Sequence, residues 1–244
     1  MISAAGSLLG VGIYSPDEAA RYARVTTRTM QRWVFGDSFG EPVIQSQLAT
    51  EGDSERLVTF VDFVQVLAVR QVRIREKRFP LQKIRKACEV ASAHYGLEYP
   101  LAAKEHKIYL FGPKDNLAAC EMVVLFGQDE AGEDLYLQLT GKKAGNFVLS
   151  AVAEPFMSKL RFGESPFAEE YVAWERGDRH IVMNPHKRFG EPFFPSTGYT
   201  AQALWEAYVA EGGVENAAKA YGVDADDVEL ACEYFDYLTG RDAA

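Results

Sequence analysis

The sequence has few of the features that mark secreted, membrane or metal-binding proteins. Its 244 residues include only three cysteines, Cys88, Cys120 and Cys232, which lie far apart and form no CxxC pair. This pattern excludes a disulfide framework and a cysteine zinc cluster, and it favours a reducing cytoplasm. No apolar run approaches the roughly 18 residues of a membrane span. The apolar residues after Met1 follow no Lys or Arg, so we expect neither a signal peptide nor a membrane partner.

Residues that carry chemistry are also scarce. The four histidines are dispersed, and His180 and His186 are six residues apart, which is not the spacing of a helical zinc pair. The sequence contains no GxSxG elbow, phosphate-binding P-loop or GxGxxG fingerprint. We therefore expect a protein that is not an enzyme and that needs no metal and no cofactor.

Charge is distributed unevenly along the chain. The net charge is −9, but residues 1–100 carry +2 and residues 201–244 carry −8. Such asymmetry indicates a basic end for nucleic acid and an acidic end for protein. The alternative is that both ends are ordinary solvated surfaces.

Two short helices are predicted near the N-terminus. Ser15, Pro16 and Glu18 form a capping signature for a helix over residues 16–23, and Thr26 or Thr27 begins a second helix that ends near Val34. A tight turn between two short helices is typical of a helix-turn-helix. Residues 43–48 and 56–60 are β-type runs around a polar loop, which predicts a hairpin and hence a wing.

The second helix presents a candidate DNA-reading surface. Met30, Trp33 and Val34 share its apolar face, which leaves the polar residues outward. We expect three side chains to enter the major groove and two hydroxyls to lie near phosphates. The groove residues are Arg28, Gln31 and Arg32, and the hydroxyls belong to Thr27 and Thr29. The alternative is that the arginines contact phosphates only.

The rest of the chain alternates between helical and β-type segments. We expect helices over residues 62–77, 80–95 and 167–176, and strands over 107–112, 121–127, 135–140, 146–152 and 180–183. Three helices follow over residues 200–211, 214–221 and 225–238, with Asp224 as the cap of the last. Eight basic residues between Arg70 and Lys86 either form a solvated helix pair or contact a DNA backbone.

Together these elements predict an α+β protein. The expected domains are a winged helix-turn-helix over residues 13–96, a β-rich region over 97–177 and a three-helix, helix-turn-helix-like domain over 178–240. One short winged helix buries little surface on DNA, so we also expect a homodimer that reads a palindromic site. The apolar strands within residues 107–152 are its candidate dimer surface.

Residues 13–96 resemble the MerR-type winged-helix DNA-binding domain. The resemblance is carried by residues 14–20 (YSPDEAA), 26–33 (TTRTMQRW), 56–60 (RLVTF) and 80–85 (PLQKIR). MerR regulators continue into a long dimerising helix, whereas this chain continues into β-type sequence. The resemblance implies a DNA-binding regulator.

Residues 178–238 resemble a small antitoxin domain of VapB-like proteins, first catalogued as a domain of unknown function, number 433. The matching segments are residues 181–185 (IVMNP), 189–192 (FGEP), 195–199 (PSTGY) and 217–223 (AAKAYGV). The two resemblances together imply a type II antitoxin that neutralises a PIN-like ribonuclease toxin and represses its own operon. The alternative is a stand-alone MerR-like regulator that senses a ligand.

The last helix is the predicted toxin-binding element. Its carboxylates would stand in for RNA phosphates in the basic groove of the toxin, and its tyrosines would act as aromatic anchors. The residues are Glu229, Glu233, Tyr234, Asp236 and Tyr237. The alternative is that the acidic residues only keep the domain soluble.

Overall fold

The computed structural model describes residues 12–38, 40–48, 56–75, 80–96, 98–103, 108–111, 121–128, 134–138, 147–149 and 156–240. The chain divides into two compact units. We call residues 14–158 and 162–168 the N-terminal unit, and residues 1–13, 159–161 and 169–244 the C-terminal unit. Helices and strands are both present, as expected of an α+β protein, and the winged helix-turn-helix layout stays a prediction. The three predicted domain boundaries stay predictions.

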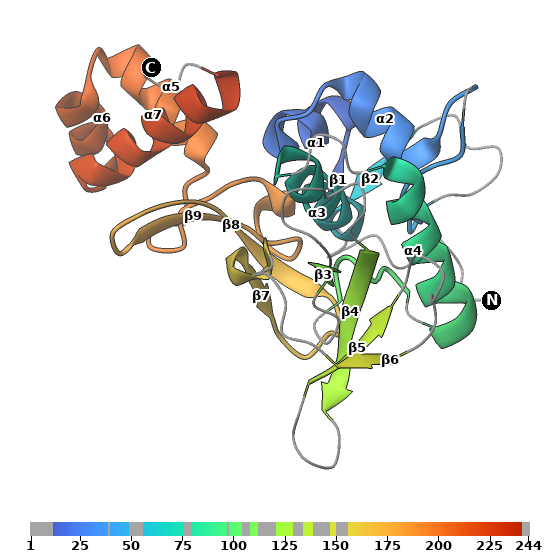
Figure 1. The fold of residues 1–244 in the computed structure, drawn as a ribbon. Coiled ribbons are helices and arrows are strands. Elements are labelled where there is room, and N and C mark those ends of the chain that lie inside the picture. The colour runs from blue at the N-terminus through green and yellow to red at the C-terminus, as the bar shows by residue number, and fades with distance from the viewer. Residues whose placement is uncertain are drawn as a thin grey trace. The chain divides into compact units, whose positions relative to one another are not determined.

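The first two helices form where the sequence predicts them. Helix α1 (Pro16–Ala23) begins with a capping box, in which the Glu18 amide donates to Ser15 Oγ at 3.2 Å and the Ser15 amide donates to Glu18 Oε2 at 2.8 Å. Arg24 ends α1 in the left-handed conformation, and α2 (Thr27–Phe35) follows. Helices α1 and α2 pack against each other (Figure 1).

The predicted hairpin is wrong, because residues 43–48 and 56–60 do not pair with each other. Residues 43–48 contain no strand, because the buried Val43 and Ile44 instead donate their amides to the Trp33 carbonyl at 2.8 and 3.2 Å. Strand β2 (Val58–Thr59) pairs with β1 (Ile13–Tyr14). The loop over residues 49–55 lies outside the described residues.

A buried carboxylate holds the segment after α2 against the next helix. Helix α3 (Phe60–Arg75) carries Asp62, which is fully buried. Its oxygens accept hydrogen bonds from Ser46 Oγ at 2.9 Å and from the amides of Gln47 and Thr59 at 3.1 and 3.2 Å. Desolvation raises the pKa of Asp62, and these hydrogen bonds oppose the shift. Asp62 therefore fixes the entry into α3.

Helix α4 (Leu81–Tyr95) ends at Gly96, as the sequence predicts. An antiparallel four-stranded sheet follows, in the order β3 (Ile108–Phe111), β4 (Glu121–Gln128), β5 (Asp134–Gln138) and β6 (Phe147–Leu149). The four predicted strands are thus confirmed. The dimer surface expected on them concerns side chains that lie outside the described part of the structure.

The predicted helix over residues 167–176 is wrong. These residues form strand β8 (Ala168–Arg176), the centre of a three-stranded sheet between β7 (Leu160–Phe162) and β9 (Arg179–Met183). Strands β8 and β9 are antiparallel, and Gly177 and Asp178 form the two-residue turn between them. The Gly-Asp pair that suggested a helix end is therefore a hairpin turn.

Three helices complete the C-terminal unit (Figure 1). They are α5 (Ala201–Glu211), α6 (Val214–Tyr221) and α7 (Ala225–Thr239), which confirms the three helices predicted over residues 200–238. Gly212 and Gly222 end the first two in the left-handed conformation that glycine adopts without strain. Small apolar side chains from all three helices form their shared core: Ala207, Ala217, Ala218 and Val228.

Candidate functional site

Helix α2 presents two arginines to solvent. Thr26 Oγ1 caps the helix by accepting the Thr29 amide at 3.1 Å, and Trp33 is buried on the inner face with Met30 and Val34. Arg28 and Arg32 are exposed. Within the part of the chain that the structure describes, neither guanidinium has a hydrogen-bonding or ionic partner.

The other predicted DNA-binding residues are partly engaged within the protein. Thr27 Oγ1 donates to Asp17 Oδ1 at 2.6 Å, which ties α2 to α1. Thr29 Oγ1 lies 2.8 Å from Thr26 Oγ1 at the cap. Gln31 is half-buried. The structure therefore leaves Arg28 and Arg32 as the most available donors of the predicted set.

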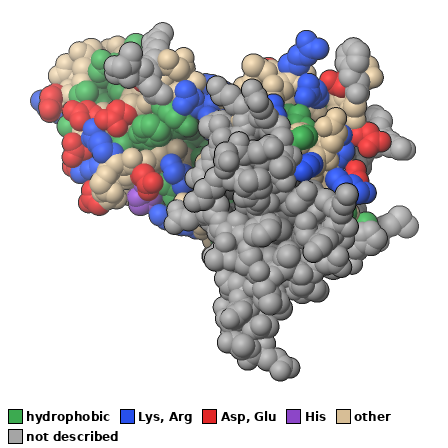
Figure 2. Space-filling model, viewed as in Figure 1, with side chains coloured by type: hydrophobic (Ala, Val, Ile, Leu, Met, Phe, Trp, Pro, Cys, Tyr) green, Lys and Arg blue, Asp and Glu red, His purple; other side chains and the backbone are tan. Residues whose placement is uncertain are grey.

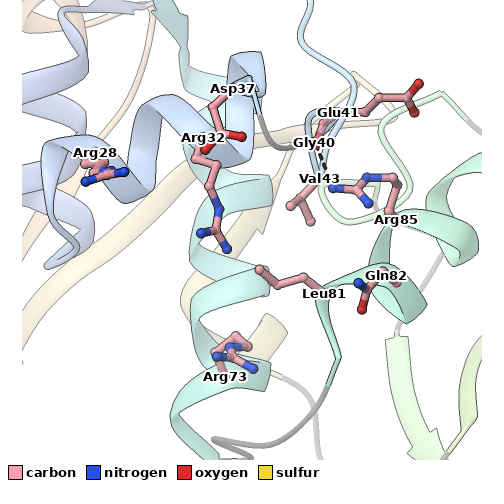
Figure 3. A pocket seen from close by; sticks show the side chains of 10 residues that line it. All are labelled: Arg28, Arg32, Asp37, Gly40, Glu41, Val43, Arg73, Leu81, Gln82 and Arg85. Carbon is pink, nitrogen blue, oxygen red and sulfur yellow. Dashed lines mark hydrogen bonds between the residues drawn. The ribbon is translucent and has the colours of Figure 1, made fainter.

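These two arginines line a cavity of about 450 Å³. Figure 3 shows arginines around it from three helices: Arg28 and Arg32 from α2, Arg73 from α3 and Arg85 from α4. The remaining lining residues are Asp37, Gly40, Glu41, Val43, Leu81 and Gln82. Four guanidiniums and two carboxylates give this surface an excess of positive charge, which suits an anionic ligand such as a phosphate. Sequence reasoning placed Arg73 and Arg85 only within a basic run.

Arg85 binds the backbone at the rim of the cavity. Its Nε donates to the Pro42 carbonyl at 2.8 Å and its Nη2 donates to the Glu41 carbonyl at 2.6 Å. It therefore fixes the segment after α2, whereas Arg28 and Arg32 are the side chains most able to reorient toward a ligand.

In the C-terminal unit, arginines from the β8–β9 hairpin bind the acidic residues of α7. Arg176 Nη1 donates to Glu233 Oε1 at 2.6 Å, and its Nη2 lies 3.3 Å from Glu229 Oε2. Partial burial lowers the pKa of Arg176, but the two carboxylates outweigh that effect and raise it above the ordinary value. Figure 2 shows acidic and basic side chains interspersed over this unit.

Arg179 binds the N-terminal end of α7. Its Nη2 lies 2.9 Å from Asp224 Oδ2, and its Nη1 donates to Asp227 Oδ1 at 2.6 Å. These two hydrogen bonds raise the pKa of the guanidinium above its ordinary value. Asp224 occupies the predicted N-cap position, but its carboxylate makes no capping hydrogen bond and binds Arg179 instead.

The five residues predicted to bind the toxin lie in different environments in the structure. Glu229 and Glu233 are bound to Arg176, and Tyr234 is only 2% exposed, so it belongs to the core. Tyr237 packs on Trp174 with ring centroids 4.5 Å apart. Asp236 is exposed. The sequence analysis did not identify Arg176 and Arg179. Interpreting the Gly-Asp pair between them as a hairpin turn would have indicated both residues.

Two further kinds of site are absent from the residues that the structure describes. They contain no group of three His, Cys, Asp or Glu residues placed to hold a metal ion. None of their helices combines the length and the apolar character needed to cross a bilayer.

Comparisons with known proteins find similar proteins in Mycobacterium tuberculosis (strain ATCC 25618 / H37Rv), and each match covers more than nine-tenths of this chain. No family model matches the chain. It is 24% identical over 237 residues to "Uncharacterized protein Rv2308", covering 93% of this chain and 92% of that one. It is 21% identical over 238 residues to a protein named "Putative antitoxin VapB45", covering 91% and 93%. The crystal structure of Rv2018 from Mycobacterium tuberculosis matches with a TM-score of 0.59 and 20% identity, covering 91% and 97%, and so shares the fold.

Proposed function

We propose that this protein is the antitoxin of a type II toxin-antitoxin pair and that it neutralises a PIN-like ribonuclease toxin. The observation that carries the proposal is the similarity to the protein named VapB45, which runs along 91% of this chain and 93% of that one. A match that spans both units is better evidence for a shared role than a match to one of them.

The same proposal assigns operator binding to the N-terminal unit. Arg28 and Arg32 are exposed on α2, beside a cavity with an excess of positive charge. Arginine on an exposed helix can pair with guanine in the major groove or with backbone phosphates. The acidic C-terminal unit is the less suitable DNA-binding surface, since residues 201–244 carry a net charge of −8.

A ligand-sensing regulator of the MerR type is the less supported alternative. Regulators of that type continue into a long dimerising helix after the DNA-binding domain. Here α4 has 15 residues and is followed by the strands β3 to β6. The position of that helix is taken by a sheet.

Coexpression tests the proposal directly. A PIN-like ribonuclease from the native host, expressed alone in a heterologous bacterium, should stop growth, and coexpression of the full chain should restore it. The two proteins should also copurify with a fixed stoichiometry. If growth stays arrested and no complex forms with any PIN-like ribonuclease of the host, the protein is not such an antitoxin.

A further inference from the structure

Phe189 is an unusually exposed aromatic residue in the C-terminal unit. Its side chain is 87% exposed, whereas the other exposed large apolar side chains in the described part of the chain range from 37% to 59%. A phenylalanine side chain stabilises the fold most when it is buried, so its nearly full exposure needs an explanation.

The backbone at Phe189 is also strained. Arg188 and Phe189 have φ angles of 49° and 56°, in the left-handed region that residues with a Cβ seldom occupy. Two such residues in succession persist only where the surrounding structure holds them, and this kind of strain is concentrated at functional sites.

The loop around Phe189 is held at both ends. The His186 amide donates to Asn184 Oδ1 at 2.9 Å, and the Gly190 amide donates to the Lys187 carbonyl at 2.9 Å. After the loop, the buried Phe193 exchanges backbone hydrogen bonds with Val182 of β9. The exposure of Phe189 is therefore imposed by a fixed loop.

Further interface-type side chains lie next to this loop. Arg188 lies against Gly198, since a Cβ added there would be 3.2 Å from Arg188 Nη2. The adjoining Tyr199 stacks edge-on with Tyr221 at 5.4 Å, and both are 37% exposed. Arginine and aromatic residues are enriched in the cores of protein interfaces. We call Arg188, Phe189, Tyr199 and Tyr221 the Phe189 surface.

Charge selects the kind of partner that fits this surface. Lys187 and Arg188 are exposed beside Phe189 and outnumber the exposed Glu191, so a partner with an acidic rim is complementary. Nucleic acid is disfavoured, because residues 201–244 of the same unit carry −8. A two-fold contact with a second copy through this loop would bring the Lys187 and Arg188 side chains of both copies into one interface, where like charges repel.

We propose that the Phe189 surface is the docking site for the toxin, with Phe189 inserted in an apolar pocket that has an acidic rim. This inference rests on the proposed antitoxin function. It moves the proposed contact away from the acidic stripe on α7 (Glu229, Glu233 and Asp236), because Arg176 already binds Glu229 and Glu233.

The test compares full-length wild type with Phe189→Asn in binding to the purified PIN-like ribonuclease. Asparagine tolerates the left-handed backbone, so this variant removes the aromatic anchor and relieves strain. We expect the Kd to rise about tenfold or more, while the thermal midpoint stays equal or rises. Val209→Ala, at an apolar position that is 59% exposed on α5, is the matched control and should leave the Kd unchanged.

A second variant tests the acidic rim. Arg188→Glu reverses the charge beside Phe189 and should weaken toxin binding, mainly through slower association at low salt. Tighter binding by this variant would contradict the acidic rim and overturn the proposal.

The outcomes separate this inference from the proposed function. If wild type binds the toxin and Phe189→Asn binds equally well, the docking site is elsewhere and the antitoxin function stands. If wild type binds no toxin, both proposals fail. If Phe189→Asn loses self-association or DNA binding but keeps toxin affinity, the surface serves a second copy or nucleic acid, and the inference is overturned.

Discussion

Arg176, the last residue of β8, donates a 2.6 Å hydrogen bond to Glu233 near the middle of α7. The two side chains are 39% and 42% exposed, so water and salt screen the pair. Such pairs contribute modestly to stability, but they fix the positions of the groups that form them. The acidic stripe on α7 is therefore part of an internal contact with the hairpin.

Exchanging the charges of Arg176 and Glu233 should measure how much this contact contributes to stability. We expect Arg176→Glu and Glu233→Arg each to lower the free energy of unfolding, and the double variant to recover part of the loss. The coupling energy should be about 0.5–1 kcal/mol at low salt, because both groups are partly exposed. Urea denaturation of the four proteins gives this energy, and it should shrink in about 1 M salt. Strictly additive effects at low salt would show that the pair contributes nothing.

The exposed arginines of α2 should be required for DNA binding. We expect Arg28→Ala and Arg32→Ala to weaken binding to the DNA upstream of the gene in gel-shift titrations. An arginine that reads a guanine should account for about 1–3 kcal/mol of discrimination. Replacing an arginine that contacts only phosphate should instead reduce the magnitude of the salt slope by about 0.9 and leave sequence preference intact.

The control for these variants is an exposed arginine in the other unit. Arg161 is 54% exposed and binds Glu170, and it is absent from the lining of the basic cavity. Arg161→Ala should leave both the affinity and the salt slope unchanged. Equal effects of all three substitutions would point to non-specific electrostatics and against a site on α2.

Two phenylalanines five residues apart should differ strongly in how much stability is lost when each is replaced by alanine. Phe194 is fully buried, so Phe194→Ala should lower the free energy of unfolding by about 3–5 kcal/mol. Phe189 is 87% exposed, so Phe189→Ala should change it by less than about 0.5 kcal/mol. Chemical denaturation measures both. A large loss of stability for Phe189→Ala would mean that its ring is packed in solution.

Asp62 should give the N-terminal unit a specific pH response. Desolvation raises its folded pKa above the ordinary 3.8, so the folded carboxyl binds a proton more readily than the unfolded one. Protonation of this group therefore favours folding. Relative to Asp62→Asn, the wild-type free energy of unfolding should rise as the pH falls through the folded pKa and level off below about 3.8. The difference between the two proteins, measured by urea titrations at several pH values, isolates this group from the other carboxylates.

Local signals were sufficient to predict most of the helices. The capping box at Ser15 and the glycines at positions 212 and 222 act within one turn of the chain, and the structure contains each of them. Strand β8 was missed because its Ala and Glu residues favour a helix locally, whereas pairing with β9 decides its conformation. The buried segment at Val43 was mistaken for a strand for a related reason, because its partner is the Trp33 carbonyl rather than another strand.

The candidate sites were predictable only in part. The periodicity of α2 correctly placed Arg28 and Arg32 on the outer face. On α7, Tyr234 follows Glu233 by one residue, which turns it about 100° around the helix toward the buried face. The prediction grouped it with the acidic stripe. The partnership of that stripe with Arg176 depends on a hairpin contact 57 residues away along the chain, which no local pattern reveals.

The two-residue turn at Gly177 and Asp178 has a consequence for how relatives of this protein can diverge. Arg176 and Arg179 flank the turn, and both hold the same helix. Inserting one residue in the turn would reverse the faces of β9 and withdraw Arg179 from α7. We therefore expect an alignment of relatives to contain no length variation here. Positions 176 and 179 should covary with positions 224, 227, 229 and 233, so that a lineage that loses an arginine also loses its carboxylates.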